Sequence, residues 1–403
     1  MSNKANFDDI PRLENQADDV ANAIAEWETE AVARICKQIG KIGRMSKKDA
    51  EKFDVEKESQ KMWLGIAGVL AVAVASDIRS LKKAYATEVN AWHNANKYLY
   101  DYRGIPFTDV SQNKQMQGII ESYAKQNAKD ILNITNTKAL SVLDRNGKVI
   151  RFKDAIYKAF GDAVKTVTEG KADFYATMRQ TVTNLGGGGC KVDYGEGITR
   201  RLDTVVRQNM LWGIKQAHDE YNEAIGKELG FDGFEISYTS NPRPTHRFME
   251  GRQFCIGTSK EIRGKHFNGM EDTRDAESGK NVTESLQDYN CRHIKSGIIC
   301  GVSEPTYSSE ELKRLKEQDE KIYKVGNLEG DGYYFSQRMR SCETEIRRCK
   351  DEINALKAFG NSEAEIKELR NRIKSVRAKY NEIAEITGIS PEPRRMSVTR
   401  GNK

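Results

Sequence analysis

The chain has 403 residues, of which 38% are hydrophobic and 31% charged, and its 65 basic and 59 acidic side chains give a formal net charge of +6. This composition is leaner in apolar residues and richer in charge than that of an average globular protein, as in proteins with long exposed helices. Few prolines argue against an all-β sandwich, and interspersed charges of both signs argue against a dedicated DNA-binding domain with a concentrated basic patch.

The cysteines point to synthesis in a reducing compartment. There are seven of them, an odd number, at wide spacings and without a Cys-x-x-Cys pair. A disulfide framework is therefore not expected. The first residues, MSNKANFDDIPRLENQADD, lack the apolar core of a secretion signal.

Residues 1–185 form a predicted N-terminal helical region. Apolar residues recur at steps of three and four between charged ones, which is the pattern of helices that bury one face. The turn dipeptide Asn146-Gly147 predicts a short hairpin over 142–152, because both residues tolerate positive φ. The predicted helices cover 8–45, 76–100, 109–137, 153–168 and 170–184.

Residues 62–75, MWLGIAGVLAVAVA, form an uncharged run of fourteen residues. A bilayer-spanning helix needs about 20 apolar residues, so we expect a buried core helix. A segment that contacts a membrane, or is buried against a partner, is the alternative.

A compact α+β module is predicted over 192–310. It follows four consecutive glycines, Gly186 to Gly189, which we interpret as a flexible linker. A helix over 196–229 shows one continuous apolar face, with Gly230 as its cap. FEISYTS at 234–240 alternates as a half-buried strand does.

The C-terminal region, 330–388, is predicted to be an antiparallel helical hairpin. Two stripes of apolar residues at alternating steps of three and four, 339–356 and 366–383, are joined by FGNSE. Gly360 should end the first helix, and Ser362 with Glu365 should form a capping box for the second. The tail, 389–403, is predicted to be a flexible basic segment. The fold class is therefore α+β and predominantly helical.

Two polar clusters in the module hold the residues suited to chemistry. Zinc binding by His246, Cys255, Cys291 and His293 is chemically permissible, although the spacing matches no common zinc pattern. Catalysis would need Cys291 as nucleophile with a histidine base, or His246 with Glu250 and Arg252 in a nuclease or transferase. We favour a structural network that hydrogen-bonds buried backbone, with no catalytic residue, no cofactor and no bound metal. Its members are Arg243, His246, Gly251, Asn290, Cys291, Arg292, His293 and Pro305.

Four motifs occur in the order found in one protein family. They are the long helix leading into FEISYTSNPRPTH, then MEGRQF, NCRH and GVSEPTY. In this order they resemble the tailed-phage minor capsid proteins of the phage minor capsid protein 2 family, which is similar in layout to the Mu F-type head morphogenesis proteins. The resemblance covers about 196–310.

The resemblance implies a structural role in the virion. Such proteins associate with the portal inside the capsid and act in head morphogenesis and in DNA packaging or ejection. The implied partners are the portal and other capsid proteins, with possible non-specific contact to packaged DNA, no small-molecule substrate, and membrane contact only through 62–75. The protein would be made in the host cytoplasm and located in the capsid interior. The alternatives are a virion-carried enzyme and a membrane-active ejection protein.

Overall fold

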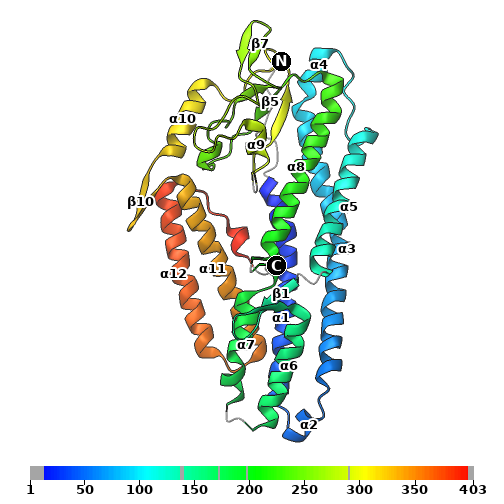
Figure 1. Ribbon diagram of the computed structural model, residues 1–403, viewed down its shortest axis with the longest axis vertical. Helices are drawn as coiled ribbons and strands as arrows, with labels where there is room; N and C mark the ends of the chain where they lie inside the picture. The colour runs from blue at the N-terminus through cyan, green and yellow to red at the C-terminus, as the bar shows by residue number, and fades with distance from the viewer. Residues whose placement is uncertain (1–12, 137–139, 171–172, 197, 289–290, 398–403) are drawn as a thin grey trace. The chain divides into compact units, whose positions relative to one another are not determined.

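The computed structural model describes residues 13–136, 140–170, 173–196, 198–288 and 291–397 (Figure 1). Long helices dominate, and the strands form small antiparallel sheets, which confirms the predicted fold class. The chain divides into two compact units. The first contains Ile78–Asn127 and Gln208–Gln337, and the second contains Ala17–Asp77, Ala128–Arg207 and Arg338–Lys403. Each unit is assembled from segments that are far apart in the sequence. The predicted domains, 1–185, 192–310, 330–388 and 389–403, stay a prediction.

The second unit is built from helices around one small sheet. Its strand order is β2-β1-β3-β4, with every neighbouring pair antiparallel. The elements are α1 (Leu13–Ile42), α2 (Lys47–Glu51), the first part of α3 (Val55–Ala95), β1 (Leu140–Leu143), β2 (Val149–Arg151), α6 (Phe152–Thr168), α7 (Phe174–Gly188), β3 (Lys191–Asp193), β4 (Thr199–Arg201), most of α11 (Gly332–Phe359), α12 (Glu363–Thr387) and η3 (Pro393–Met396). The predicted hairpin is confirmed by the β1–β2 pair, where Gly147 has φ +77° in the turn.

The four glycines do not form a linker, so that interpretation is wrong. Gly186, Gly187 and Gly188 make the last turn of α7. A Cβ on Gly186 would lie 2.6 Å from Ala355 Cβ and 3.0 Å from Glu352 Cα. Glycine is required here because the backbones of α7 and α11 approach closely.

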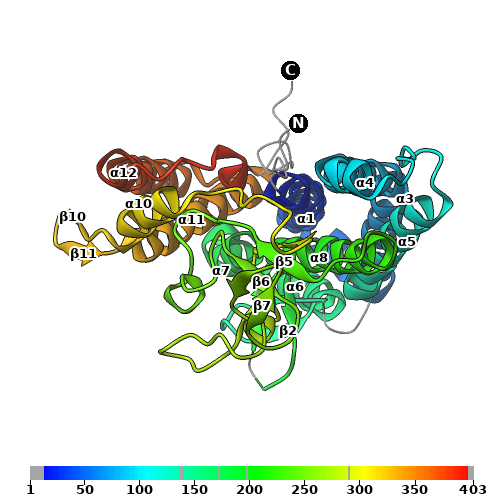
Figure 2. The ribbon, with the colours of Figure 1, turned by 90° about the horizontal axis from the view of Figure 1, so that it is seen from above.

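The C-terminal hairpin is present as predicted. Helices α11 and α12 lie side by side in both views (Figure 1 and Figure 2), and Gly360, with φ +94°, ends the first. Tyr380 donates to Glu343 Oε1 across the hairpin at 3.1 Å. The capping box is wrong, because Ser362 makes no side-chain cap bond and its hydroxyl donates to the Gly360 carbonyl instead.

The first unit combines helices with three small antiparallel sheets. Strand order β6-β5-β9 forms the three-stranded sheet, while β7-β8 and β10-β11 are two-stranded. Its elements are the end of α3, α4 (Lys97–Arg103), most of α5 (Lys114–Asn136), most of α8 (Leu202–Leu229), β5 (Gly233–Ile236), η2 (Pro244–His246), β6 (Gln253–Cys255), β7 (Lys260–Ile262), β8 (Lys265–Phe267), α9 (Val282–Leu286), β9 (Lys295–Ile298), α10 (Ser309–Glu320), β10 (Tyr323–Val325) and β11 (Leu328–Gly330).

Helix α8 begins six residues later than predicted. Residues 199–201 pair with β3 as strand β4, and Ile198, assigned to the apolar face, is 56% exposed. The ladder partners offered by β3 outweigh the helical periodicity there. Gly230, with φ +70°, follows the helix as predicted.

The apolar run 62–75 lies inside one helix, α3, which begins at Val55 and does not start afresh at residue 76. Ile66 is buried and Trp63 packs against Phe152, but Leu64 is 62% and Val69 37% exposed, so over residues 62–69 the expected burial holds for one face of the helix only. The side chains of 70–77 lie outside the described part. Among the described residues, no helix has an apolar stretch long enough to cross a bilayer.

Candidate functional site

The three-stranded sheet brings the two polar clusters of the sequence together. Central strand β5 pairs with both β6 and β9, with Ile236 opposite Lys295. Just beyond that pair, the Ser237 amide donates to the Ile294 carbonyl, and the Ile236 amide donates to the Arg252 carbonyl. The loop that follows β5 and the loop that precedes β9 therefore lie at the same end of the sheet.

His246, Cys291 and His293 converge where these loops meet. His246 ends the 3-10 turn η2, whose Pro244 fixes the backbone at its first position. Its Nδ1 lies 3.4 Å from His293 Nδ1, and Cys291 Sγ lies 3.4 Å from the same His293 nitrogen. The three potential ligand atoms all lie within 4.8 Å of one another. Both imidazoles are buried, and the thiol is half-buried.

A carboxylate holds the far side of each imidazole. His246 Nε2 lies 3.2 Å from Asp288 Oδ2, and His293 Nε2 contacts Glu250 Oε1. Glu250 is itself fixed, because its other oxygen accepts from the Thr239 amide at 2.7 Å. Since a carboxylate accepts hydrogen bonds, each Nε2 carries a proton and each Nδ1 is left facing the other ring and the thiol.

The proton affinities reflect this packing. Burial alone would raise the pKa of Cys291, but hydrogen bonds from His246 and His293 lower it to about 5. Burial alone would lower the pKa of His293, yet hydrogen bonds to Cys291 and Glu250 raise it to about 9. Both shifts run toward the charged forms, because the thiol and the imidazole are hydrogen-bonded to each other.

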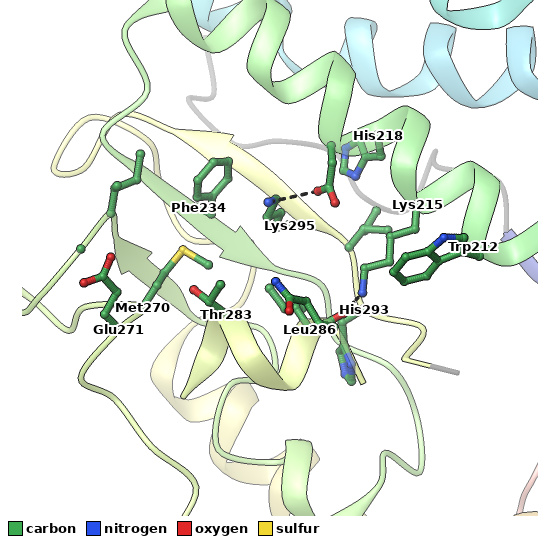
Figure 3. Close-up of a pocket in the computed structure, with 15 residues that line it drawn as sticks. Trp212, Lys215, His218, Phe234, Met270, Glu271, Thr283, Leu286, His293 and Lys295 are labelled. Atoms are coloured by element: carbon green, nitrogen blue, oxygen red, sulfur yellow. Dashed lines mark hydrogen bonds and ion pairs between the residues drawn. The ribbon is translucent and has the colours of Figure 1, made fainter. Parts of the chain in front are cut away.

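A cavity of about 240 Å³ lies next to this cluster, between α8, the sheet and α9 (Figure 3). Its rim carries Trp212 and two lysines. Lys215 donates to the Leu286 carbonyl, and Lys295 pairs with Asp219 at 3.1 Å. His293 lies at the edge of the cavity, with its ring pointing away from the centre. The cavity and the histidine–thiol cluster are thus neighbouring but separate features.

The proposed zinc set needs one correction. Cys255 does not join the other three residues. Its side chain packs with Ile298 and Cys300, and its thiol faces the Thr258 carbonyl at 3.3 Å. Strand β6 places Cys255 opposite Gly233, at the far end of β5 from the cluster. In the enzyme alternative, Glu250 does join the cluster, whereas Arg252 is exposed.

Of the remaining predicted site residues, Arg243 contacts the cluster. Arg243 is half-buried, and its Nη1 lies 3.5 Å from Asp288 Oδ2. Gly251 has φ +62° and packs under Leu312, while Pro305 is exposed. Arg292 is half-buried. Asn290 lies outside the described residues.

Sequence reasoning missed Asp288. Its carboxylate meets His246 and also Lys280, and hydrogen bonds from these two lower its pKa although burial raises it. The Cys291 amide donates to the Asp288 carbonyl at 2.9 Å, which holds the acid and the thiol close together. An acidic residue three positions before Cys291 was the available signal.

Comparison with protein families bears on the whole chain. The family model described as Phage minor capsid protein 2 matches residues 10–384. The chain belongs to this family. No curated protein and no solved structure matches it. The family makes this a structural phage capsid protein located in the virion, while the similarity in layout to Mu F-type proteins stays a prediction.

Proposed function

We propose that this minor capsid protein docks on the portal inside the capsid and acts in head morphogenesis and in DNA packaging or ejection. The observation that carries the proposal is the family match over residues 10–384. Two features of the structure support it: an exposed apolar stretch that suits a protein partner, and a module whose polar groups are used in bracing.

The exposed stretch lies on α3. Leu64 and Val69 are exposed, and a Cβ on Gly65 or Gly68 would meet nothing within 4 Å. Residues four apart lie on one face of a helix, so these four positions form an open apolar surface. Such a surface permits close approach by another apolar helix. We assign the portal as its partner.

The module around the β6-β5-β9 sheet supplies the rigid body for docking. Arg243, His246 and Asp288 connect the two loops through hydrogen bonds and ion pairs. We propose that Cys291, Arg292 and His293 belong to the same brace. Replacing His246 with Ala should then lower the melting temperature, whereas the same change at exposed His266 should not.

An asymmetric reconstruction of the procapsid around the portal vertex tests the location. The expected result is density for this chain on the inner surface of the portal. Density on the outside of the shell, or spread over all vertices, would contradict the proposal.

Leu64→Glu tests the docking surface. A buried charge at an interface is costly, so incorporation into heads should fall well below wild type while the circular dichroism spectrum is unchanged. Lys57→Glu is the matched control, since it alters an exposed charge in the same helix. Equal incorporation of the two variants would exclude this surface.

A virion-carried enzyme remains the second candidate, because the Cys291 thiol lies 3.4 Å from an imidazole nitrogen of His293, an arrangement typical of nucleophilic sites. Incubation of the protein with nucleic acid and with nucleotide substrates, with and without chelator, tests it. A turnover that Cys291→Ser abolishes would favour the enzyme over the structural role. A membrane-active ejection protein would co-sediment with vesicles, and Leu64→Glu should weaken that partitioning.

A further inference from the structure

We propose that His246, Cys291 and His293 form a zinc site, in which the two Nδ1 atoms and the thiolate are ligands and water takes the fourth position. The inference is independent of the portal proposal, because it concerns only how the two loops of the module are held together.

Two of the distances between the ligand atoms match those of a zinc tetrahedron, and all three atoms lie within 4.8 Å of one another. Zinc binds imidazole nitrogen at about 2.0–2.1 Å and thiolate sulfur at about 2.3 Å, so tetrahedral angles place two nitrogens about 3.3 Å apart and nitrogen and sulfur about 3.5 Å apart. The observed separations are 3.4 Å for the two Nδ1 atoms and 3.4 Å for Cys291 Sγ and His293 Nδ1.

The far side of each ring is arranged as in metal centres. Histidines that bind a metal through one nitrogen commonly donate the other N–H to a carboxylate, which fixes the tautomer and the ring orientation. Asp288 occupies that place for His246, and Glu250 does so for His293. Both rings therefore turn Nδ1 toward the other ring and the thiol.

Without a metal ion the two rings need a proton between them. Two buried Nδ1 atoms facing each other at 3.4 Å repel unless one of them carries a proton. A zinc ion takes the place of that proton and satisfies both nitrogens and the thiolate at once, and the displaced proton leaves to solvent. Mixed imidazole and thiolate donors select zinc over magnesium or calcium, which prefer oxygen ligands.

Access to the site is through the thiol. Both histidines are at most 3% exposed, whereas Cys291 is half-buried. An ion would therefore enter from the Cys291 side. It would tie the loop after β5 to the loop before β9.

Metal analysis of the full-length protein, purified without added metal, provides the first test. We expect close to one zinc per chain by mass spectrometry of the element. Replacement by cobalt should produce the visible bands of a tetrahedral ion and a thiolate-to-cobalt charge-transfer band.

The variants separate ligands from neighbours. Cys291→Ser should lose the charge-transfer band, and His293→Gln should reduce bound zinc to near zero. Asp288→Asn should keep the ligands but weaken zinc affinity about 10- to 100-fold. Cys255→Ser, a buried thiol outside the cluster, should bind zinc like wild type, and circular dichroism checks that each variant folds.

Two results would overturn the proposal. One is a folded wild-type protein that binds neither zinc nor cobalt after reduction of its thiols. The other is zinc binding that survives both Cys291→Ser and His293→Gln. A metal-bound protein that does not dock on the portal would refute the proposed function and leave the zinc site standing.

Discussion

Two buried polar clusters in this protein differ in how their charged and polar groups are paired. The arginine cluster of the second unit contains Asp18, Glu28, Arg201, Asp203, Arg207, Arg347 and Asp351. The histidine cluster of the first contains His246, Glu250, Asp288, Cys291 and His293. In the arginine cluster every carboxylate lies beside a guanidinium of the same chain. In the histidine cluster, two imidazole Nδ1 atoms and a thiol sulfur face one another instead.

The arginine cluster is centred on Asp203, at the start of α8. Asp203 accepts from Arg347 of α11, and Arg201 bridges Asp203 and Asp351 at 3.4 and 3.0 Å. Burial would raise the pKa of Asp203, but the three neighbouring arginines lower it to about 2. Buried charges that are matched in this way need no further ion. The arginine cluster therefore balances its charges with its own side chains, whereas the histidine cluster has the geometry of a cation site.

The largest expected effect comes from removing the centre of the arginine cluster. Asp203→Asn keeps the side-chain shape but leaves Arg347 and Arg201 buried without their shared counter-charge, and should lower the free energy of unfolding by about 3–5 kcal/mol. Denaturant titration measures it. Glu30→Gln, which breaks the exposed pair with Arg34, should cost below about 0.5 kcal/mol. Similar losses for both would mean that the cluster is not a brace.

Protonation of Glu28 gives a pH test of the same cluster. Burial, reinforced by Asp351 and Asp203 and opposed by Arg201, raises the pKa of Glu28 from 4.5 to about 8. The folded state therefore binds more protons than the unfolded state between these values, and its stability falls as pH rises from about 5 to about 8.

Glu28→Gln should remove that loss. The variant should gain roughly 1–3 kcal/mol relative to wild type between pH 5 and pH 8. Thermal melts at a series of pH values measure the difference. A difference that is constant over this range would show that Glu28 is ionised in the folded protein.

Close packing of α7 on α11 underlies the arginine cluster. Gly186→Ala would push its new methyl group against Ala355 and Glu352, next to Asp351, and should cost about 1–3 kcal/mol. Gly161→Ala is the matched control, because a Cβ there meets nothing within 4 Å, and should stabilise α6 by about 0.5–1 kcal/mol. If both variants changed the free energy of unfolding in the same direction, the close approach of α7 and α11 would be contradicted.

The smallest expected effect is the difference between two glycine variants. One of them, Gly251, lies in the loop that carries His246 and Glu250. Gly251 and Gly257 both have positive φ, but only Gly251 lies under another side chain, with Leu312 2.6 Å from the position of a Cβ. Alanine should cost about 1–2 kcal/mol at either site through backbone strain. Contact with Leu312 should lower the free energy of unfolding of Gly251→Ala by about 1 kcal/mol more. Equal losses at the two sites would show that the loop moves to make room for the methyl group.

Much of the fold was predictable because it depends on local patterns. The steps of three and four in α8, α11 and α12 reflect the helix period, and Asn146-Gly147 specifies a tight turn in any context. The misplaced start of α8 and the missed role of Gly186 have one cause. Each depends on a partner segment, β3 or α11, that is distant in sequence.

The site shows the same division. The sequence by itself determined the fold class, the hairpin and the family, and it drew attention to His246, Cys291 and His293 as unusual residues, because composition, periodicity and motif order are properties of the chain alone. Only the tertiary structure decided that Cys255 stands apart, that Asp288 joins, and that two imidazoles face each other. Those outcomes depend on strand register and loop closure, which bring together residues 40 or more positions apart.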